Sequence, residues 1–420
     1  MKLTRKSFLA ALGAALAGTA LTKGTRPPHL LLRCGWQTVN IGDIAHTPGM
    51  LRLLQRHLPD AAVTLWPSRV DNGVAEMLLK AFPKLKIVGG TTGDDGLPDT
   101  PELAKAWKEC DFLLHGSGPS VVAHRHLAAW RRHTGKPFGI FGVTMDHLDD
   151  ALRDLLNAAR FVYLRDGVSR AVVERSGVTE PVVEFAPDAA FAFDLRNESA
   201  AEAWLKTHRL EPGKFVCAIP RLRYTPYFKI HRRAPKGLDL ERDAVSEKFK
   251  EPDHAKLREA LVDFARRTGV RLVACPEMTH ELQLAREQII DPLPDDVRKS
   301  AVWREAWWLP DEAASVYARA LAVVSMEMHS PILAVAAGTP ALHLRQPTDT
   351  SKAQMWRDIG LKDWIFEIET AKPKDIADCL GEIHDNPAAA KTHAAGAMDF
   401  VRRRHAETLA AVGRKTGGAG

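Results

Sequence analysis

The chain has 420 residues, more than one hydrophobic core ordinarily serves, so we expect two domains. The hydrophobic fraction of 45% and the charged fraction of 26% are ordinary for a soluble globular protein. The net charge of +6 is modest for this length and no dense tract of Lys and Arg occurs, so a nucleic-acid partner is not expected.

The cysteines exclude two further kinds of site. They are five in number, far apart in the chain, and form no CxxC pair, so the sequence predicts neither a zinc site nor a disulfide framework. We expect no metal and no cofactor, and at least four cysteines serving as small buried hydrophobes. The five are Cys34, Cys110, Cys217, Cys275 and Cys379.

The N-terminus has the plan of an export signal. Basic residues precede an apolar run over 8–21, and Ala15 and Ala17 offer a cleavage site. The run is shorter than a typical membrane span, so a cleaved signal over 1–24 is favoured over a membrane anchor or an amphipathic helix. Residues 4–9 resemble a twin-arginine signal, with Lys6 in place of the second arginine. We therefore expect an exported protein of the bacterial periplasm or cell envelope, free of the membrane after cleavage, and a cytoplasmic one if the signal does not function.

Apolar runs and helical patterns then alternate. Strands are expected at 29–34, 62–66, 86–88, 111–114, 138–142, 161–164 and 182–185. Helices are expected between them at 47–57, 72–82, 122–133, 149–159 and 169–176. This alternation predicts an α/β domain with a doubly wound parallel sheet and helices on both faces. We place this N-terminal Rossmann-like domain at 29–195.

Two turns of this domain follow strands, where doubly wound folds bind ligands. The first carries Asn40, Gly42 and Asp43. It lacks the GxGxxG fingerprint of dinucleotide-binding proteins, and Asp43 as a simple helix cap is an equal alternative. The second turn carries Gly116, Ser117 and Gly118. Its glycines let a ligand approach the backbone, although tight packing alone also favours glycine.

The pattern starts again at Lys214 and predicts a second Rossmann-like domain over 205–412, followed by a frayed tail at 413–420. Arg221 and Arg223 follow its first strand, where forked donors can hold an anion. A helix is expected at 255–268 and a strand at 271–274. Next comes His280, which either orients a substrate or caps the following helix.

The stretch 322–344 reads as a strand, a polar turn, a helix over 331–337 and a second strand. Pro331 suits a first helical position. The turn carries Glu327 and His329, at the place where a βαβ unit usually binds its ligand. A histidine that only caps the helix is the alternative for His329. Glu327 can be a catalytic base, a ligand to a sugar hydroxyl or an exposed turn residue, and the sequence does not separate these.

The order of these motifs resembles the polysaccharide pyruvyl transferase family. The resemblance covers roughly 35–361 and depends on the following segments in this order. They are Asn40-Ile41-Gly42-Asp43, His115-Gly116-Ser117-Gly118, Leu164-Arg165-Asp166 with Ser169, Pro187-Asp188-Ala189, Met278-Thr279-His280-Glu281, and Met328-His329 followed by Ala334, Ala337, Gly338 and Pro340, with Lys352 where the family often has lysine.

The resemblance implies a GT-B-like fold with the active site in a cleft between two domains. It implies transfer of pyruvate from phosphoenolpyruvate, as a ketal, to hydroxyls of a cell-envelope glycan. His329 would be the acid or base, and Arg221 or Arg223 would bind the donor. Where the family has an arginine, this chain has Glu327, so Arg345 or Lys352 would have to supply the lost positive charge.

Three hypotheses remain open from the sequence. The first is a pyruvyl transferase that acts on an envelope glycan. The second is a different enzyme on the same scaffold, glycosyltransferase-like or hydrolytic, which Glu327 favours. The third is an exported glycan-binding protein without catalysis. Trp303, Trp307 and Trp308 can stack on sugar rings, but core packing is the favoured role.

Overall fold

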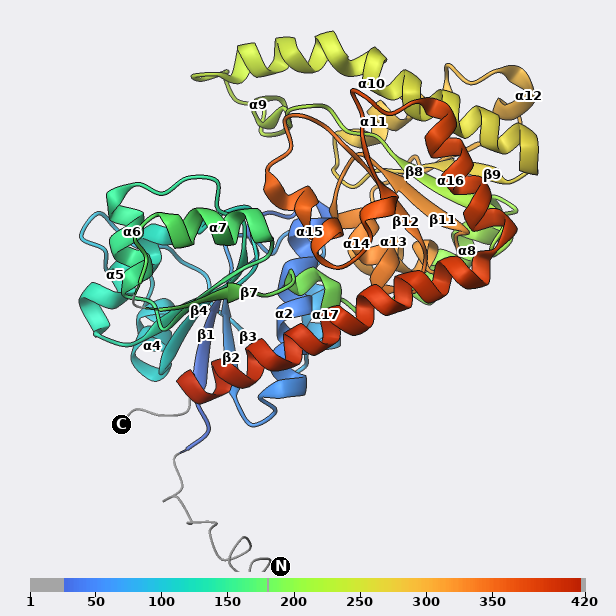
Figure 1. The fold of residues 1–420 in the computed structure, drawn as a ribbon. Coiled ribbons are helices and arrows are strands. Elements are labelled where there is room, and N and C mark those ends of the chain that lie inside the picture. Colours follow the sequence, from blue (N-terminus) through green and yellow to red (C-terminus); the bar gives the residue numbers. More distant parts are fainter. Residues whose placement is uncertain (1–25, 180, 417–420) are drawn as a thin grey trace, which may run out of the picture.

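In the computed structural model, which describes residues 26–179 and 181–416, the chain folds into two α/β halves (Figure 1). The predicted export signal lies outside the described residues. Among the helices that are described, none is long and apolar enough to cross a membrane. The predicted tail is partly wrong, because the last helix continues to Thr416.

The first half is built on a seven-stranded parallel sheet with the order β3-β2-β1-β4-β5-β6-β7. Its strands are β1 (His29–Arg33), β2 (Ala62–Trp66), β3 (Lys86–Ile87), β4 (Phe112–His115), β5 (Phe138–Val143), β6 (Phe161–Leu164) and β7 (Val182–Phe185). The helices between them are α2 (Ile41–His57), α3 (Val74–Ala81), α4 (Pro101–Glu109), α5 (His124–Thr134), α6 (Asp150–Asn157) and α7 (Gly167–Arg175). The predicted doubly wound sheet is confirmed.

The second half has a six-stranded sheet with the order β10-β9-β8-β11-β12-β13, again parallel. Its strands are β8 (Phe215–Ile219), β9 (Arg271–Ala274), β10 (Val302–Trp303), β11 (Ala322–Ser325), β12 (Ala341–Arg345) and β13 (Ile365–Glu367). Its helices are α8 (Glu198–Thr207), α9 (Tyr227–Ile230), α10 (Asp239–Thr268), α11 (Glu281–Ala285), α12 (Asp295–Arg298), α13 (Pro310–Tyr317), α14 (His329–Ala336), α15 (Gln354–Asp358) and α16 (Pro373–Asp385).

The last helix, α17 (Pro387–Thr416), runs from the second half back along the first (Figure 1). On the first half Arg404 donates through Nη2 to the backbone oxygen of Phe185 at 2.7 Å, and a ring nitrogen of His405 lies 3.0 Å from the backbone oxygen of Pro187. The helix therefore ties the end of β7 to the C-terminal part of the chain.

Both sheets have cores of buried aliphatic and aromatic side chains. β1, β4, β8 and β11 are buried along most of their length and form the centres of these cores. Four cysteines are buried as expected, and Cys379 is half-buried. Trp308 is buried in the core with Trp303 and Trp307 packed against it, so the expected core role of these tryptophans is confirmed.

Three helices begin earlier than the sequence predicted. Helix α2 begins at Ile41 rather than at residue 47, and α10 begins at Asp239 rather than at 255. In each case a proline lies inside the helix, Pro48 and Pro252, although proline normally marks a helix start. Helix α14 begins at His329 rather than at Pro331.

Candidate active site

The C-terminal ends of the strands of both sheets face a cavity of about 260 Å³ between the two halves. Asn40, Asp43 and Arg165 line it from the first half, and Glu327, His329 and Lys352 from the second. Five lining side chains are cationic and two are carboxylates. The cations are Arg165, Arg221, Arg223, Arg242 and Lys352, and the carboxylates are Asp43 and Glu327.

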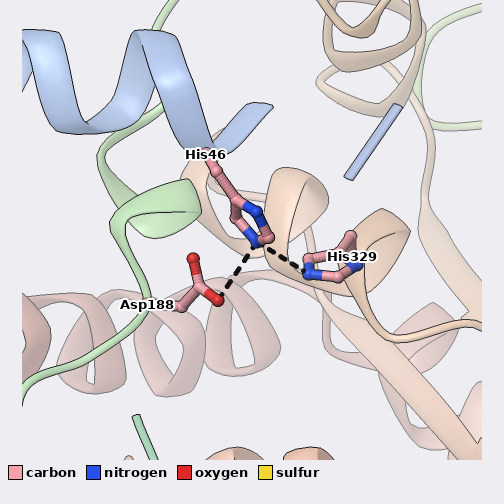
Figure 2. Close-up of side chains that lie close together, drawn as sticks. All are labelled: His46, Asp188 and His329. Atoms are coloured by element: carbon pink, nitrogen blue, oxygen red, sulfur yellow. Dashed lines mark hydrogen bonds and ion pairs between the residues drawn. The ribbon is translucent and has the colours of Figure 1, made fainter. Parts of the chain in front are cut away.

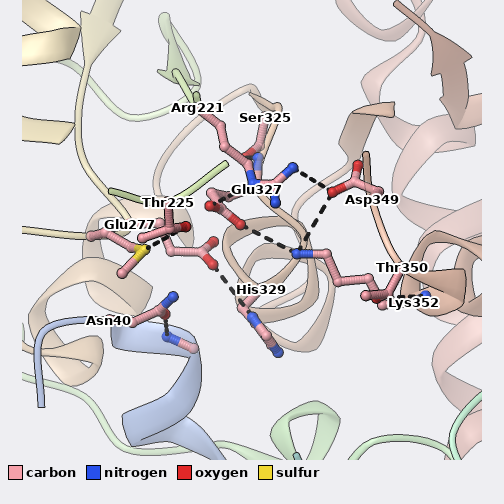
Figure 3. Close-up of polar contacts among 12 residues, drawn as sticks. Asn40, Arg221, Thr225, Glu277, Ser325, Glu327, His329, Asp349, Thr350 and Lys352 are labelled. Atoms are coloured by element: carbon pink, nitrogen blue, oxygen red, sulfur yellow. Dashed lines mark hydrogen bonds and ion pairs between the residues drawn. The ribbon is translucent and has the colours of Figure 1, made fainter. Parts of the chain in front are cut away.

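Glu327 is held between two of these cations (Figure 3). Arg221 donates through Nε to Oε1 of Glu327 at 2.9 Å, and Nζ of Lys352 lies 3.5 Å from Oε2. Arg221 also forms an ion pair through Nη1 with Asp349. Burial alone would lower the pKa of Arg221, but Asp349 and Glu327 outweigh burial and raise it. Glu327 is therefore not an exposed turn residue, and Lys352 supplies the positive charge at this position.

The other arginines differ in how free their donors are. Arg223 forms a two-bond ion pair with Asp253, at 2.8 and 2.9 Å, and donates to Glu369 at 3.0 Å, so its donors are occupied. The guanidinium of Arg242 lies over the ring of Tyr224, 5.5 Å from its centre. Arg242, which the sequence did not single out, is thus a further cation at the cavity.

His329 lies between two groups from distant parts of the chain. Its Nε2 is 3.1 Å from Nε2 of His46, and its Nδ1 is 3.3 Å from Oε1 of Glu277. The other oxygen of Glu277 accepts from the backbone N–H of Ser330 at 2.6 Å and so caps helix α14. Burial, with His46 as the next cause, lowers the pKa of His329 to about 3. The ring is therefore neutral at neutral pH.

Behind His329 lies a buried ion pair. Nη1 of Arg165 is 2.7 Å from Oδ2 of Asp188, and the same oxygen is 3.3 Å from Nε2 of His46 (Figure 2). Burial alone would raise the pKa of Asp188, but His46 and Arg165 outweigh it and hold this pKa well below the usual range.

The same three side chains, His46, Asp188 and His329, are also a candidate metal-binding group, since one ligand atom of each lies within 4.8 Å of the others. Two imidazoles and a carboxylate are a donor set that zinc and iron accept. However, the carboxylate oxygen that faces His46 already pairs with the Arg165 guanidinium. A divalent cation there would meet a positive charge at close range, so the geometry favours a proton network over a metal centre.

The family model for polysaccharide pyruvyl transferase matches residues 40–346. The chain belongs to this family. The matched segment contains both halves of the cavity up to the end of β12, including His329 and Glu327. No curated protein matches the chain in sequence.

Solved structures show the same two-domain GT-B architecture. Medicago truncatula UGT71G1, solved with UDP-glucose, matches with a TM-score of 0.56 at 10% identity, covering 93% of this chain and 99% of that chain. A putative UDP-N-acetylglucosamine 2-epimerase from Listeria monocytogenes gives 0.56 at 13% identity, covering 93% and 97%. Anabaena HepE, in complex with UDP and glucose, gives 0.54 at 12% identity, covering 93% and 99%. At these identities the likeness concerns the fold alone.

The family motif around Asn40 forms the first turn of α2 and not the turn before it. The Asn40 side chain accepts from the backbone N–H groups of Gly42 and Asp43, at 2.7 and 3.3 Å, so Asn40 is the helix cap. Asp43, which the sequence offered as the cap, lines the cavity instead and pairs with Gln37. Asn40 lines the cavity as well.

Gly42 makes room for His329. A Cβ atom at position 42 would lie 2.2 Å from Cγ of the His329 ring, far inside van der Waals contact. We therefore expect Gly42→Ala to displace His329 and to lower turnover at least tenfold, because a small misplacement of a reacting group costs rate steeply. Turnover and thermal unfolding of Gly42→Ala, with Gly396→Ala in the exposed part of α17 as the control, measure this. Unchanged turnover in Gly42→Ala would contradict it.

The remaining predicted site residues are not among those that line the cavity. Ser117 accepts through Oγ from the backbone N–H of Ala189 at 3.0 Å, and Gly116 and Gly118 pack closely against Cys34 and Trp36. His280 is half-buried, and neither ring nitrogen hydrogen-bonds to any described residue. Arg345 pairs with Glu367 at 3.0 Å and is not among the lining residues.

Sequence reasoning missed His46, Glu277, Arg242 and Tyr227 as site residues. His46 lies one turn after Gly42 on α2, but the helix was expected to begin only after it. An earlier helix start would have placed it on the same face as Gly42, toward the ligand-binding end of the sheet. Glu277 directly follows Pro276 after β9, where a carboxylate at a strand end was a usable signal.

Proposed function

We propose that the protein transfers pyruvate from phosphoenolpyruvate to two hydroxyls of a cell-envelope glycan, forming a ketal. The observation that carries this proposal is the cavity between the domains, with an excess of cationic side chains and with His329 in its wall. A donor with a phosphate and a carboxylate needs such cations. Membership of the pyruvyl transferase family supports the same reaction class.

The reaction places defined demands on the site. One sugar hydroxyl adds to the central carbon of the donor and gives up its proton to the site, while the methylene carbon takes up one proton from the site. A second hydroxyl then closes the ketal, inorganic phosphate leaves, and the hydroxyl proton leaves with it. His329 is the group that we assign as proton donor to the methylene carbon. Lys352 and Arg242 bind the phosphate and the carboxylate, because Arg221 and Arg223 are engaged in closer ion pairs with carboxylates than the 3.5 Å contact of Lys352 with Glu327.

A second cavity offers a place for the glycan. It has a volume of about 460 Å³ and shares Gln37, Asp43 and Tyr227 with the first cavity. Its other walls include Trp36 and His231. Aromatic faces beside amide and carboxylate groups suit sugar rings. We assign the acceptor to this surface, in place of the buried tryptophans of the second half.

Calorimetric titration with phosphoenolpyruvate tests the donor. We expect the wild type to bind, and Lys352→Met to bind about tenfold more weakly, since a charge pair at about 4 Å contributes roughly 1–4 kcal/mol. Glu327→Gln removes a negative charge from the cavity while its amide oxygen can still accept from Arg221. We expect this variant to bind about tenfold more tightly.

Lys374→Met is the matched control, because Lys374 is exposed on α16 and pairs with Asp378 of the same helix. Absence of binding by both the wild type and Glu327→Gln would overturn phosphoenolpyruvate as the donor. Two alternatives would then remain: a different enzyme on the same scaffold, which Glu327 favours, and an exported glycan-binding protein without catalysis. Export to the envelope is part of the proposal and depends on the signal-like residues 1–24.

A further inference from the structure

Two contacts near Lys352 join the two halves of the molecule. Oδ2 of Asp358, the last residue of α15, accepts from the backbone N–H of Gly167 at 2.7 Å. Gly167 is the first residue of α7 in the first half, and α15 packs against this helix (Figure 1). Ser351 makes the second contact, because its Oγ lies 3.1 Å from Oγ of Ser169. We call these two contacts the α7–α15 latch.

Each side of the latch is held in place by its own neighbours. Gln354, one turn earlier in α15, donates through Nε2 to Oδ1 of Asp358 at 2.8 Å. In α7 the side chain of Asp166 accepts from the backbone N–H of Ser169 at 2.7 Å, so the helix has a cap of its own. A first helical residue such as Gly167 has no acceptor for its N–H within its own helix. Asp358 supplies that acceptor from the other half, and its carboxylate also suits the positive end of the helix dipole.

The latch borders one side of the cavity, and a contact of a different kind borders the other. There the segments 39–41 and 277–279 exchange two backbone hydrogen bonds, both of 3.0 Å. Asn40 of that contact and Lys352 beside the latch both line the cavity, and Figure 3 shows them on opposite sides of His329. The first contact is made by backbone groups alone, whereas the latch depends on side chains. The two halves can therefore part at the latch while they stay joined at 39–41.

Lys352 and the latch belong to one short stretch of chain. Lys352 lies in the 3₁₀ turn η3 (Ser351–Ala353), which runs directly into α15. Because no loop separates Lys352 from Asp358, movement of one displaces the other. The ammonium group of Lys352 lies 3.5 Å from Oε2 of Glu327 and 3.9 Å from Oδ1 of Asp349, both in the second half. What the latch adds is the distance from that ammonium group to the cavity wall that the first half supplies.

We propose that Asp358 is a positioning residue: it holds Lys352 and the wall around it against the first half, and so maintains the closed cavity that binds the donor. This rests on the proposed role of Lys352 in binding a phosphate or a carboxylate. The donor enters and the phosphate leaves while the latch is open. Without Asp358 the closed form is a smaller fraction of the protein, so a ligand that needs it binds more weakly in proportion. Saturating ligand restores the closed form, and turnover is then kept.

Proton exchange at the Gly167 amide tests the latch without any substrate. In the full chain, labelled with ¹⁵N in its glycines, the Gly167 signal is the one that disappears in Gly167→Ala. Gly167 is exposed, so its amide is protected from exchange while Asp358 accepts from it. We expect exchange at least about tenfold faster in Asp358→Ala than in the wild type. Asp358→Asn should protect the amide nearly as well as the wild type, because its amide oxygen still accepts.

Gly167→Pro removes the hydrogen-bond donor from the other side of the latch. Proline suits a first helical position, and the extended backbone of Asp166, with φ −146° and ψ 152°, accommodates a following proline. We expect Asp358→Ala and Gly167→Pro each to raise KM for phosphoenolpyruvate about tenfold, with kcat changed less than about threefold. Asp358→Asn and Gly167→Ala should keep the wild-type KM. The alanine retains the N–H, and its Cβ would lie 3.4 Å from Oδ1 of Asp358, an ordinary contact.

Thr100→Ala measures what the loss of a helix cap does by itself. Thr100 caps α4 within the first half, where its Oγ1 accepts from the backbone N–H of Leu103 at 3.3 Å, and it lines neither cavity. This variant should lower the unfolding temperature but leave KM unchanged. If Asp358 only stabilised the fold, Asp358→Ala would behave in the same way: the loss of folded protein would lower kcat and leave KM as it is.

Two results would overturn the inference. One is exchange at Gly167 that is as fast in the wild type as in Asp358→Ala. The other is a wild-type KM in both Asp358→Ala and Gly167→Pro. If the wild type neither binds nor turns over phosphoenolpyruvate, the proposed function fails, and exchange at Gly167 alone decides whether the latch exists.

Discussion

His329→Gln is expected to lower turnover by about 10²–10⁴-fold, the usual contribution of a general acid. The residue is the first of α14, but it does not hold the helix end with its side chain; Glu277 does this by accepting from the backbone of Ser330. The substitution should therefore change the free energy of unfolding by no more than about 1–2 kcal/mol, the loss of one buried hydrogen bond. Phosphate release from phosphoenolpyruvate in the presence of envelope glycan measures turnover, and thermal unfolding measures stability.

The matched comparison is Glu277→Gln. This variant keeps an oxygen for the Ser330 N–H but removes the carboxylate that faces Nδ1 of His329. If His329 served only to cap the helix, His329→Gln would unfold at a clearly lower temperature and its lost activity would follow the lost folded fraction. Full turnover by folded His329→Gln would exclude the assigned role altogether.

Arg165→Met is expected to be the most destabilising single change at the site, by about 3–5 kcal/mol. It leaves the buried carboxylate of Asp188 without its cation, and an uncompensated buried charge costs this much. Thr144 also loses the hydrogen bond that it accepts from Nε of Arg165 at 2.7 Å. Urea unfolding measures the loss in the free energy of unfolding, provided that this free energy falls with urea concentration equally steeply in the wild type and the variant.

The double variant Arg165→Met with Asp188→Asn is the control, because it removes both charges and should recover a large part of the lost stability.

The contribution of this ion pair to stability depends on pH in a definite direction. The pKa of Asp188 is lowered on folding, so its stabilisation is present above the ordinary aspartate pKa and is lost as the pH falls through the acid range. The difference in the free energy of unfolding between the wild type and Arg165→Met should become smaller below about pH 4. A difference in the free energy of unfolding under about 1 kcal/mol at pH 7 would show that the Arg165–Asp188 pair is not an important source of stability.

Much of the fold could be predicted because it depends on local pattern. The alternation of short apolar runs with amphipathic helices predicts a parallel doubly wound sheet, and both sheets have that form. The family motifs also identified His329, Glu327 and Lys352, which do line the cavity. The local pattern mispredicted the first residues of several helices. Pro48 and Pro252 mark starts by their chemistry, yet both lie inside longer helices.

The start of α14 shows why such errors arise. Its cap is the carboxylate of Glu277, more than fifty residues earlier in the chain, and no residue next to the helix indicates it.

The environment of Glu327 also depends on residues that are distant in the sequence. In the sequence it replaces a family arginine and reverses a charge, but in the structure Arg221 and Lys352 enclose it. Its electrostatic effect depends on partners that only folding brings near.

The sequence by itself determined the two-domain α/β architecture, the family and the turn that carries His329, because these depend on periodicity and on motif order. Only the tertiary structure decided which groups touch that histidine. His46 and Asp188 belong to the first half of the molecule. Glu277 belongs to the second half, in the loop after β9, far from His329 in the sequence. Burial and charge act through space, so the neutral ring of His329 and the buried cluster of His46, Asp188 and Arg165 behind it exist only where the two halves meet.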